Sequence, residues 1–466
     1  MSGMGEATGT REPWGWRLWL STAAVVIIAG WLQAYGISTW PMADDEVPSL
    51  VELGLLDIDA ATFSVPRDQV GRLPRTVPVW YGTQRFLLDR LPDSELSYRL
   101  PSLVYGILTS VVVFLLAARW RGLWFAAALA IVLNLSQPFV YLAQLNRFYS
   151  MPLLLLTLAL AAIWAPGRGW LMAGATVVLT VLAVLSHNMT MAVLVLAFMA
   201  AVPAFVLGHA PLRVVWRSGL AASVGLGLYV FYIRPLVAGW HSTGNPTPVL
   251  ISFAAHAGIP TLALASLGGW FSVARRSEGR SMFWWSLMFL GSFFVFQLTD
   301  IGWNPRYFLF FMPAMWVLAA YSAEQVARSV GAGWTGAVWY AVVALLLAPG
   351  ILSHFQDGSR HDYRQAAAVL RDAAQGEQPI LSDDAETISY YLPEAVRRRL
   401  FVRTKVTALP DTEFFLVVRA NAWMAQPRAP DRRVDLLAEI GRRRYDHFSH
   451  VLRVYRVSSG RQPFTP

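Results

Sequence analysis

Eleven long apolar runs constrain the fold of this chain more than any other feature of its sequence. A bilayer holds no water to pair with exposed N–H and C=O groups, so an apolar run of about 20 residues must cross it as a helix. The chain is 55% hydrophobic and only 14% charged, against about 25% charged residues in an ordinary soluble protein. The expected spans are Leu18–Gly36, Leu100–Ala117, Leu123–Val140, Phe148–Ala165, Trp170–Leu185, Met189–Gly208, Gly219–Ile233, Val249–Ala274, Met282–Leu298, Tyr307–Ser322 and Trp334–Ser353. The sequence therefore predicts a polytopic α-helical membrane protein and argues against a soluble enzyme.

The orientation of these spans follows from the short loops that connect them, because cytoplasmic loops keep an excess of Arg and Lys. One alternating set of loops holds nine Arg: 119, 121, 168, 213, 217, 275, 276, 280 and 328. The other set holds only three, Arg147, Arg234 and Arg306. The first set and the N-terminus are therefore expected in the cytoplasm. The first span reads as an uncleaved anchor, being too long for a cleaved signal peptide.

The chain is expected to divide into two parts, a membrane module over residues 1–353 and an extracytoplasmic domain over residues 354–466. The second part alternates helix and strand patterns, which is typical of a small α/β domain. The expected elements are helices at Tyr363–Asp372, Thr387–Leu392 and Val434–Arg443, and strands at Pro379–Ser382, Phe414–Val418 and Val451–Val457. The chain has no Cys, which excludes disulfides, thiolate metal sites and a Cys nucleophile.

A segment of about sixty residues, Ile37–Arg99, separates the first two spans on the outer side, and loops of that length are usually functional. It opens with three consecutive acids, Asp44, Asp45 and Glu46. Alone, such a run is as easily a solvated turn or a helix start, where carboxylates suit the helix dipole. Further on, Val79–Leu91 carries an apolar stripe that fits either a helix in the membrane interface or ordinary packing against the spans.

Polar residues also gather at the outer ends of other spans. Taken singly, an outer Arg can snorkel to lipid head groups, and a lone His can be a bonded core residue. The residues concerned are Arg147, Phe148, Tyr149, His187, Asn188, Arg306 and Tyr307. Guanidinium groups match phosphate oxygens, and a carboxylate can take the proton of an incoming hydroxyl. Acids and Arg at one membrane face thus point to group transfer from a lipid phosphate to an alcohol.

The chain resembles the GT-C glycosyltransferases, in the branch with protein O-mannosyltransferases and lipid A aminoarabinose transferases. The motifs that carry the resemblance occur in the family's order along nearly the whole chain. They are Asp45-Glu46, Tyr98-Arg99-Leu100-Pro101-Ser102, Asn146-Arg147-Phe148-Tyr149, Ser186-His187-Asn188, Pro305-Arg306-Tyr307 with Pro313, Asp362-Tyr363-Arg364 and Tyr390-Tyr391-Leu392-Pro393.

The resemblance implies a sugar donor on a polyprenyl phosphate, used on the outer side of the cytoplasmic (inner) membrane. The catalytic set it implies is Asp45, with Asp44 as the alternative base and Glu46 beside them. Donor-phosphate binding falls to Arg147, Arg306 and Arg99. Substrate binding falls to Tyr149, His187, Asn188 and Tyr307. The acceptor is a hydroxyl on a glycan, a lipid or a protein, and no nucleic acid is expected.

Three questions stay open at this point. No metal site is assigned, although three acids can bind a divalent cation through oxygen. A flippase or transporter for lipid-linked glycans is one alternative, but we find no broken helices in two corresponding halves. An envelope polysaccharide polymerase or ligase is another, although here the long loop directly follows the first span.

Overall fold

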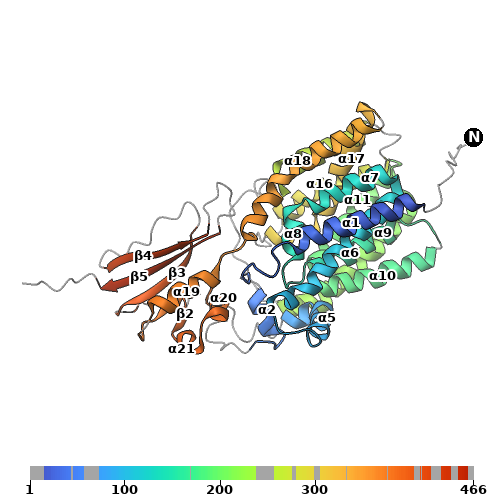
Figure 1. Ribbon diagram of the computed structural model, residues 1–466. Helices are drawn as coiled ribbons and strands as arrows, with labels where there is room; N and C mark the ends of the chain where they lie inside the picture. Colours follow the sequence, from blue (N-terminus) through green and yellow to red (C-terminus); the bar gives the residue numbers. More distant parts are fainter. Residues whose placement is uncertain are drawn as a thin grey trace, which may run out of the picture.

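The protein has a helical bundle and a smaller sheet-containing domain that lie end to end (Figure 1). The structure is a computed structural model. It describes residues 15–43, 46–56, 73–167, 169–237, 257–274, 280–298, 305–331, 333–374, 376–403, 410, 412–420, 432–441 and 450–459.

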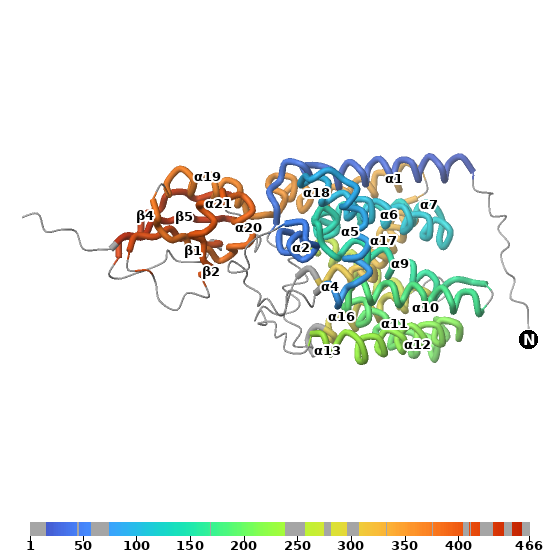
Figure 2. The backbone as a smooth tube through the Cα atoms, turned by 90° about the horizontal axis from the view of Figure 1, so that it is seen from below, coloured from blue at the N-terminus to red at the C-terminus, as the bar shows by residue number. Residues whose placement is uncertain are grey.

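The bundle contains a helix in each of the eleven predicted spans. These helices are α1 (Trp16–Ala34), α6 (Glu95–Arg121), α7 (Leu123–Asn134) with α8 (Gln137–Ala143), α9 (Ser150–Trp164), α10 (Gly169–Ser186), α11 (Met189–Val206), α12 (Leu212–Leu228) with η2 (Tyr229–Ile233) and α13 (Arg234–Val237), α15 (Ile259–Ala274), α16 (Arg280–Leu298), η3 (Pro305–Phe310) with α17 (Met312–Val330), and α18 (Trp334–Asp357). The described part of the loop after α1 holds three shorter helices: α2 (Glu46–Glu52), α4 (Leu73–Thr76) and α5 (Pro78–Leu88). In Figure 2, α1 follows one edge of the bundle and α12 the opposite edge.

Six of these helices are long and apolar enough to cross a membrane by themselves, and α7 with α8 passes as a seventh that is bent by 68°. Three more, Ser150–Trp164, Ile259–Ala274 and Ser281–Val295, are apolar but shorter. The chain is therefore a multi-pass membrane protein, and the total of eleven spans stays a prediction.

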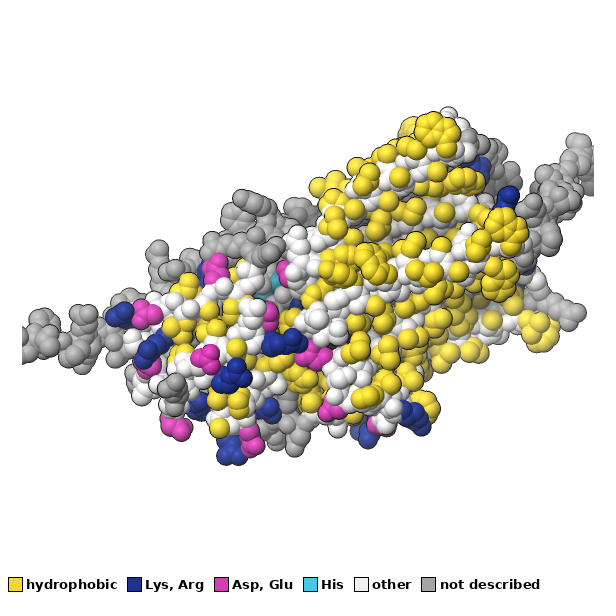
Figure 3. All heavy atoms as spheres, in the orientation of Figure 1, with side chains coloured by type: hydrophobic (Ala, Val, Ile, Leu, Met, Phe, Trp, Pro, Cys, Tyr) yellow, Lys and Arg dark blue, Asp and Glu magenta, His cyan; other side chains and the backbone are white. Residues whose placement is uncertain are grey.

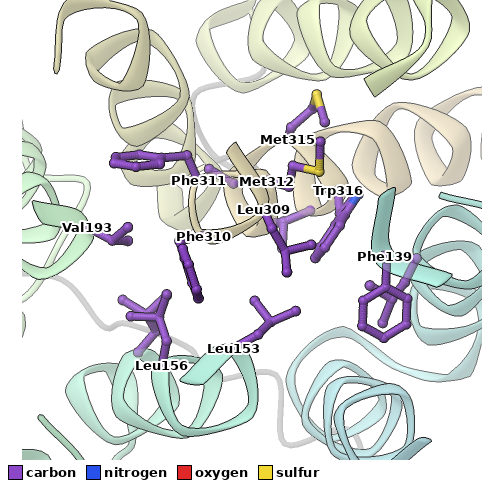
Figure 4. Packing of buried hydrophobic residues seen from close by; sticks show 14 of the residues in the cluster. Phe139, Leu153, Leu156, Val193, Leu309, Phe310, Phe311, Met312, Met315 and Trp316 are labelled. Atoms are coloured by element: carbon purple, nitrogen blue, oxygen red, sulfur yellow. The ribbon is translucent and has the colours of Figure 1, made fainter. Parts of the chain in front are cut away.

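Helix α17 runs through the middle of the bundle, packed against α7, α15, α16 and α18. Fourteen of its residues are buried, including Glu324 and Gln325. Its N-terminal approach, η3, inserts Phe310 toward Leu153 and Leu156 of α9, while Trp316 faces Phe139 at 5.7 Å between ring centres (Figure 4). This packing joins η3 to the helices that carry the other outer-end residues.

Trp40 fixes the first turns of the long outer loop. Its ring lies against two glycines, Gly36 and Gly358, which both have positive φ (71° and 66°). A Cβ at Gly36 would lie 2.3 Å from the ring, and one at Gly358 would lie 2.5 Å from it. Both positions therefore require glycine for two reasons, the backbone conformation and the close approach of the indole. The contact ties the end of α1 to the end of α18.

The apolar stripe at Val79–Leu91 belongs to α5, and its buried face packs against the spans. Trp80 is 1% exposed and meets the ring of Phe148 at 5.7 Å. Gln84 is also buried and donates to Asn146 Oδ1 at 2.7 Å. Of the two interpretations of this segment, packing against neighbouring helices is the one the structure supports.

The C-terminal domain is a mixed five-stranded sheet with helices on one face. The strand order is β2-β1-β3-β5-β4, with β1 parallel to β2 and β3, and β5 antiparallel to β3 and β4. The elements are α19 (Tyr363–Ala373), β1 (Ile380–Ser382), α20 (Ala385–Tyr391), α21 (Glu394–Arg397), β2 (Leu400–Val402), β3 (Phe414–Ala420), β4 (Arg432–Ile440) and β5 (Val451–Ser459). Leu370 and Ile388 of the helices share a core with Phe415 and Val454 of the sheet.

Two details of the sheet differ from the prediction. The segment Val434–Arg443, expected to be a helix, is strand β4 over its described part, paired with β5. A bulge between Leu436 and Ala438 adds one residue there and shifts the alternation of side chains, which made the pattern look helical. The three-residue strand β2 was not expected at all.

Candidate functional site

The buried carboxylate of Glu46 organises the loop after α1. It accepts hydrogen bonds from Arg99 Nε and Nη2, both at 2.9 Å, and from Arg360 Nη1 at 3.2 Å. It also accepts from the backbone N–H of Ala43 at 2.8 Å and of Asn146 at 2.9 Å. Burial alone would raise the pKa of Glu46, but Arg99 and Arg360 outweigh it and hold the pKa at about 2. The carboxylate thus stays ionised and joins α2, α6, the α8–α9 segment and the C-terminal linker.

Arg99, the main partner of Glu46, is itself fully buried and fully hydrogen-bonded. Arg99 also donates to the carbonyls of Ile37, Trp40 and Pro41, at 2.6, 3.0 and 2.8 Å. Its side chain and that of Glu46 have no exposed surface. Every nitrogen of the Arg99 guanidinium is thus engaged inside the loop. Glu46 and Arg99 thus form a buried ion pair inside the loop, and their contact with a substrate stays a prediction.

Asp44 and Asp45 lie outside the described residues. The residues on either side of them, Ala43 and Glu46, are both buried, and they are joined by the hydrogen bond from Ala43 N to Glu46. The position of the two aspartate side chains therefore stays a prediction, while the two ends of their short segment are fixed.

Arg147 lies beside the same loop. It follows Asn146, whose backbone N–H bonds to Glu46, and its Nη1 donates to Ser49 Oγ of α2 at 2.7 Å. Its guanidinium carbon is 4.7 Å from the centre of the Phe148 ring. The side chain is half-buried, unlike that of Arg99. Arg147 thus presents a positive charge next to the segment that carries the aspartates.

His187 stands at the centre of an aromatic cluster next to Arg147. Its ring centre lies 4.5 to 5.9 Å from those of four aromatic residues, Phe148, Tyr149, Tyr307 and Phe310. Burial and the nearby charge of Arg147 lower the pKa of His187 to about 3, so the imidazole is neutral. Its Nδ1 accepts from Met189 N at 3.1 Å, so the proton is on Nε2. That buried N–H has no hydrogen-bond partner in the described part of the chain.

The structure thus brings Tyr149, His187 and Tyr307 together, with Arg147 at the edge of the cluster. Asn188 follows His187 and is half-buried at the start of α11. Arg306 lies in η3 directly before Tyr307, but its side chain is outside the described part.

Glu52, which the sequence did not single out, is a second acid of this region. Its carboxylate accepts a hydrogen bond from the hydroxyl of Tyr81 in α5. Burial raises the pKa of Glu52 to about 7; Arg147 opposes the shift and Glu386 of α20 adds to it. The sequence feature that could have pointed to Glu52 is its place three residues after Ser49. Residues three apart in a helix lie on the same face, so Glu52 faces the same side of α2 as the serine that bonds to Arg147.

The C-terminal domain is attached to this same loop. Arg364 of α19 forms an ion pair with Glu95 at 2.9 Å and donates to the carbonyl of Thr39 at 3.2 Å. The hydroxyl of Tyr391 accepts from Met42 N at 2.6 Å and donates to Glu95 at 3.2 Å. Helix α20 also contacts α2, and both figures of the backbone place α2 at the end of the bundle that faces the sheet domain (Figures 1 and 2). The two parts of the protein therefore meet at Thr39, Met42 and α2.

Glu46 does not fit the part of a metal ligand. Both of its oxygens already accept hydrogen bonds from arginine and backbone N–H groups. Within the described ranges, no three histidine or acidic side chains lie close enough together to hold a metal ion.

No family model and no curated protein matches this sequence. Solved structures do match its fold. ArnT from Cupriavidus metallidurans matches in the apo state (TM-score 0.58, 13% identity, 94% of this chain and 98% of that one). It also matches when bound to undecaprenyl phosphate (TM-score 0.57, 14% identity, 95% and 98%).

The oligosaccharyltransferase of Archaeoglobus fulgidus in its apo form matches with a TM-score of 0.51 and 13% identity, over 84% of this chain and 65% of that one. Identities this low are evidence of fold alone. The match spans nearly the whole chain in ArnT, so this chain has the GT-C fold, as its sequence motifs predicted.

Proposed function

We propose that this protein is a glycosyltransferase that moves a sugar from a polyprenyl phosphate to a hydroxyl acceptor. The observation that carries the proposal is the position of Arg147. Its side chain bonds to Ser49, and its neighbour Asn146 bonds to Glu46, on the helix that begins directly after Asp45. A cation for a lipid phosphate and an acid for an acceptor hydroxyl are thereby carried by segments that touch.

The structural neighbours support the same kind of donor. One ArnT structure is bound to undecaprenyl phosphate, and the archaeal oligosaccharyltransferase AglB is described in complex with an inhibitory peptide and a dolichol-phosphate. Both ligands are polyprenyl-type phosphates, which is the chemistry that the outer arginines of this chain suit.

Asp45 is the proposed general base, with Asp44 as the alternative. It takes the proton of the acceptor hydroxyl while that oxygen attacks the anomeric carbon. The bond from the anomeric carbon to the phosphate oxygen breaks, and the electron pair leaves on the lipid phosphate. A single displacement of this kind inverts the anomeric configuration. Positioned proton transfer contributes about 10²–10⁴-fold to the rate.

Arg147 and Arg306 are the proposed phosphate ligands, because their positive charges offset the negative charge that develops on the leaving group. A phosphate leaves readily in this way without a second carboxylic acid, in contrast to glycoside hydrolysis, where an acid must protonate the leaving oxygen. Tyr149, His187, Asn188 and Tyr307 are proposed to line the substrate space. The neutral His187 contributes its Nε2–H as a donor toward an oxygen of the bound substrate.

The protein is proposed to lie in the cytoplasmic (inner) membrane, with its site on the side that faces away from the cytoplasm. The large excess of Arg in the loops at the opposite end of the bundle supports that direction. Five exposed tryptophans lie near the helix ends on the Arg-rich, predicted cytoplasmic side: Trp16, Trp19, Trp124, Trp170 and Trp334.

The test is incubation of the purified protein with a panel of polyprenyl-phosphate sugars and soluble hydroxyl acceptors, with released polyprenyl phosphate as the readout. Release that requires both the sugar-loaded donor and an acceptor supports a transferase. Movement of the loaded lipid across a vesicle membrane without release would instead support a flippase.

A further inference from the structure

A second polar site lies at the other end of the bundle, away from the sheet domain. A pocket of about 230 Å³ opens between the end of α6, the start of α7, the end of α17 and the start of α18. We call it the basal pocket, and the lining residues used below are Arg121, Gly122, Glu324, Arg328, Gly333 and Tyr340. None of them belongs to the glycosyl-transfer site proposed above.

The local sequence explains why this place is hollow. Helices α6 and α17 each end on a glycine with positive φ, Gly122 (97°) and Gly331 (114°), and Gly333 before α18 has a φ of 95°. These are backbone conformations that favour glycine. A Cβ built at Gly122 or Gly333 would meet no described atom within 4 Å. The described residues of these turns leave the space beside Gly122 and Gly333 open.

The walls of the basal pocket carry one net positive charge. Glu324, which is 1% exposed, accepts from Arg121 Nε at 3.2 Å and from Arg328 Nη2 at 2.7 Å. Arg121 is held over the rings of Phe125 and Tyr321, at 5.5 and 5.0 Å. The side chain of Arg328 is 54% exposed. Two cations thus share a single carboxylate, and an anion with one negative charge would balance the group.

A buried hydroxyl points to the kind of ligand. Tyr340 lines the pocket and is 5% exposed, yet its hydroxyl has no hydrogen-bond partner within the described part of the chain. Buried polar groups in folded proteins nearly always have such a partner. An oxygen acceptor in the pocket would supply it, beside the cation of Arg328.

The surroundings place the basal pocket at the depth of lipid head groups. The ring of Trp124 lies 5.7 Å from that of Tyr340 and is 53% exposed, while Trp334 is 77% exposed. Exposed tryptophans of this kind mark the membrane–water interface. Figure 3 shows Arg side chains beside large hydrophobic ones at this end of the bundle.

We propose that the basal pocket binds the phosphodiester of an anionic phospholipid. The phosphate oxygens accept from Tyr340 and pair with Arg328, and the acyl chains leave past Trp124 into the bilayer. The bound lipid then joins the ends of α6, α7, α17 and α18. Basic pockets between spanning helices are known places for lipid head groups.

The experiment measures the dissociation constant of phosphatidylglycerol for the delipidated protein in detergent by native mass spectrometry. We expect one tight site, stronger for phosphatidylglycerol than for the zwitterionic phosphatidylcholine. Tyr340→Phe removes one hydrogen bond and should weaken binding about two- to tenfold. Arg328→Gln removes a charge and should weaken it roughly tenfold or more.

Arg119→Gln is the matched control, because Arg119 is an exposed arginine at the same helix end that does not line the basal pocket. It should leave the affinity within about twofold. Equal binding by wild type, Tyr340→Phe and Arg328→Gln would overturn the proposal, as would an equal loss in Arg119→Gln. If inorganic phosphate saturates the basal pocket but does not displace phosphatidylglycerol, the lipid binds elsewhere, and the proposal that the pocket's ligand is a phospholipid would be overturned. Melting curves identify any variant that fails to fold. If Arg328→Gln does not fold, the affinity of the more conservative Tyr340→Phe decides whether the pocket binds the lipid.

Discussion

Arg360 Nη1 lies 3.2 Å from Glu46 Oε2, although 314 residues separate the two in the chain. The same carboxylate also holds Arg99 from the start of α6. The linker to the C-terminal domain is therefore part of the framework that supports the segment with Asp44 and Asp45. The C-terminal part of the chain therefore does more than cover the membrane module, because its Arg360 forms an ion pair inside the loop after α1.

Replacement of Arg360 by Ala should destabilise the protein strongly. The change leaves Glu46 buried with one cation fewer, and breaking a buried ion pair from one side costs about 3–5 kcal/mol. Arg364→Ala is the matched control, because Arg364 is 46% exposed in its ion pair with Glu95 and such pairs contribute about 0–1 kcal/mol. Thermal unfolding followed by tryptophan fluorescence measures both. Equal melting temperatures for the two variants would contradict the framework.

The melting temperature should also depend on pH through Glu52. Its pKa is raised from 4.5 to about 7 in the folded protein. This group's contribution to stability is therefore fully present below about pH 4.5 and is lost as the pH rises through about 7. Glu52→Gln should melt with a flatter pH profile between pH 5 and 8, and above the wild type at pH 8. The exposed Glu377→Gln is the control, and a profile for Glu52→Gln identical to that of the wild type would refute the shift.

Loss of the Arg147 side chain should weaken donor binding more than folding. A charge-assisted hydrogen bond is worth about 1.5–3 kcal/mol, so Arg147→Ala should raise the dissociation constant for a polyprenyl phosphate roughly tenfold to a hundredfold. The exposed Arg234→Ala, on the same predicted side of the membrane, should bind as the wild type does. Competition with a labelled polyprenyl phosphate provides the measurement. An unchanged constant in Arg147→Ala would remove it from the proposed phosphate site.

The helices of the bundle were predictable because hydropathy over about 20 residues reports a local requirement of the bilayer. Most boundaries agree within a few residues, for example Met189–Gly208 against α11 (Met189–Val206). Helix α17 extends to Val330, eight residues past the predicted end at Ser322, because its polar residues Glu324 and Gln325 are buried by neighbouring helices. Hydropathy cannot register that kind of burial.

The candidate site was predictable in part. The sequence motifs assigned Tyr149, His187 and Tyr307 to one site, and in the structure the rings of Tyr149 and Tyr307 both lie near that of His187. Their part in substrate binding stays a prediction. The sequence did not predict that Glu46 is fully buried in an ion pair while Arg147 is only half-buried. An acid or an arginine in an outer loop has the same sequence signature whether it is fully buried in a structural ion pair or open to a substrate. The burial of Glu46 depends on contacts with Arg99 and Arg360, which lie 53 and 314 positions further along the chain, and such contacts leave no mark on the local sequence.

The central claim is that a carboxylate of the Asp44–Asp45 pair takes the acceptor proton. The most direct measurement is the transfer rate of Asp45→Asn, Asp44→Asn and the double variant, beside their melting temperatures and affinities for the donor lipid. The account predicts that Asp45→Asn loses about 10²–10⁴-fold in rate while it melts and binds donor as the wild type does. Glu46→Gln, in contrast, should melt at a lower temperature. Transfer by the double variant at close to the wild-type rate would contradict the account.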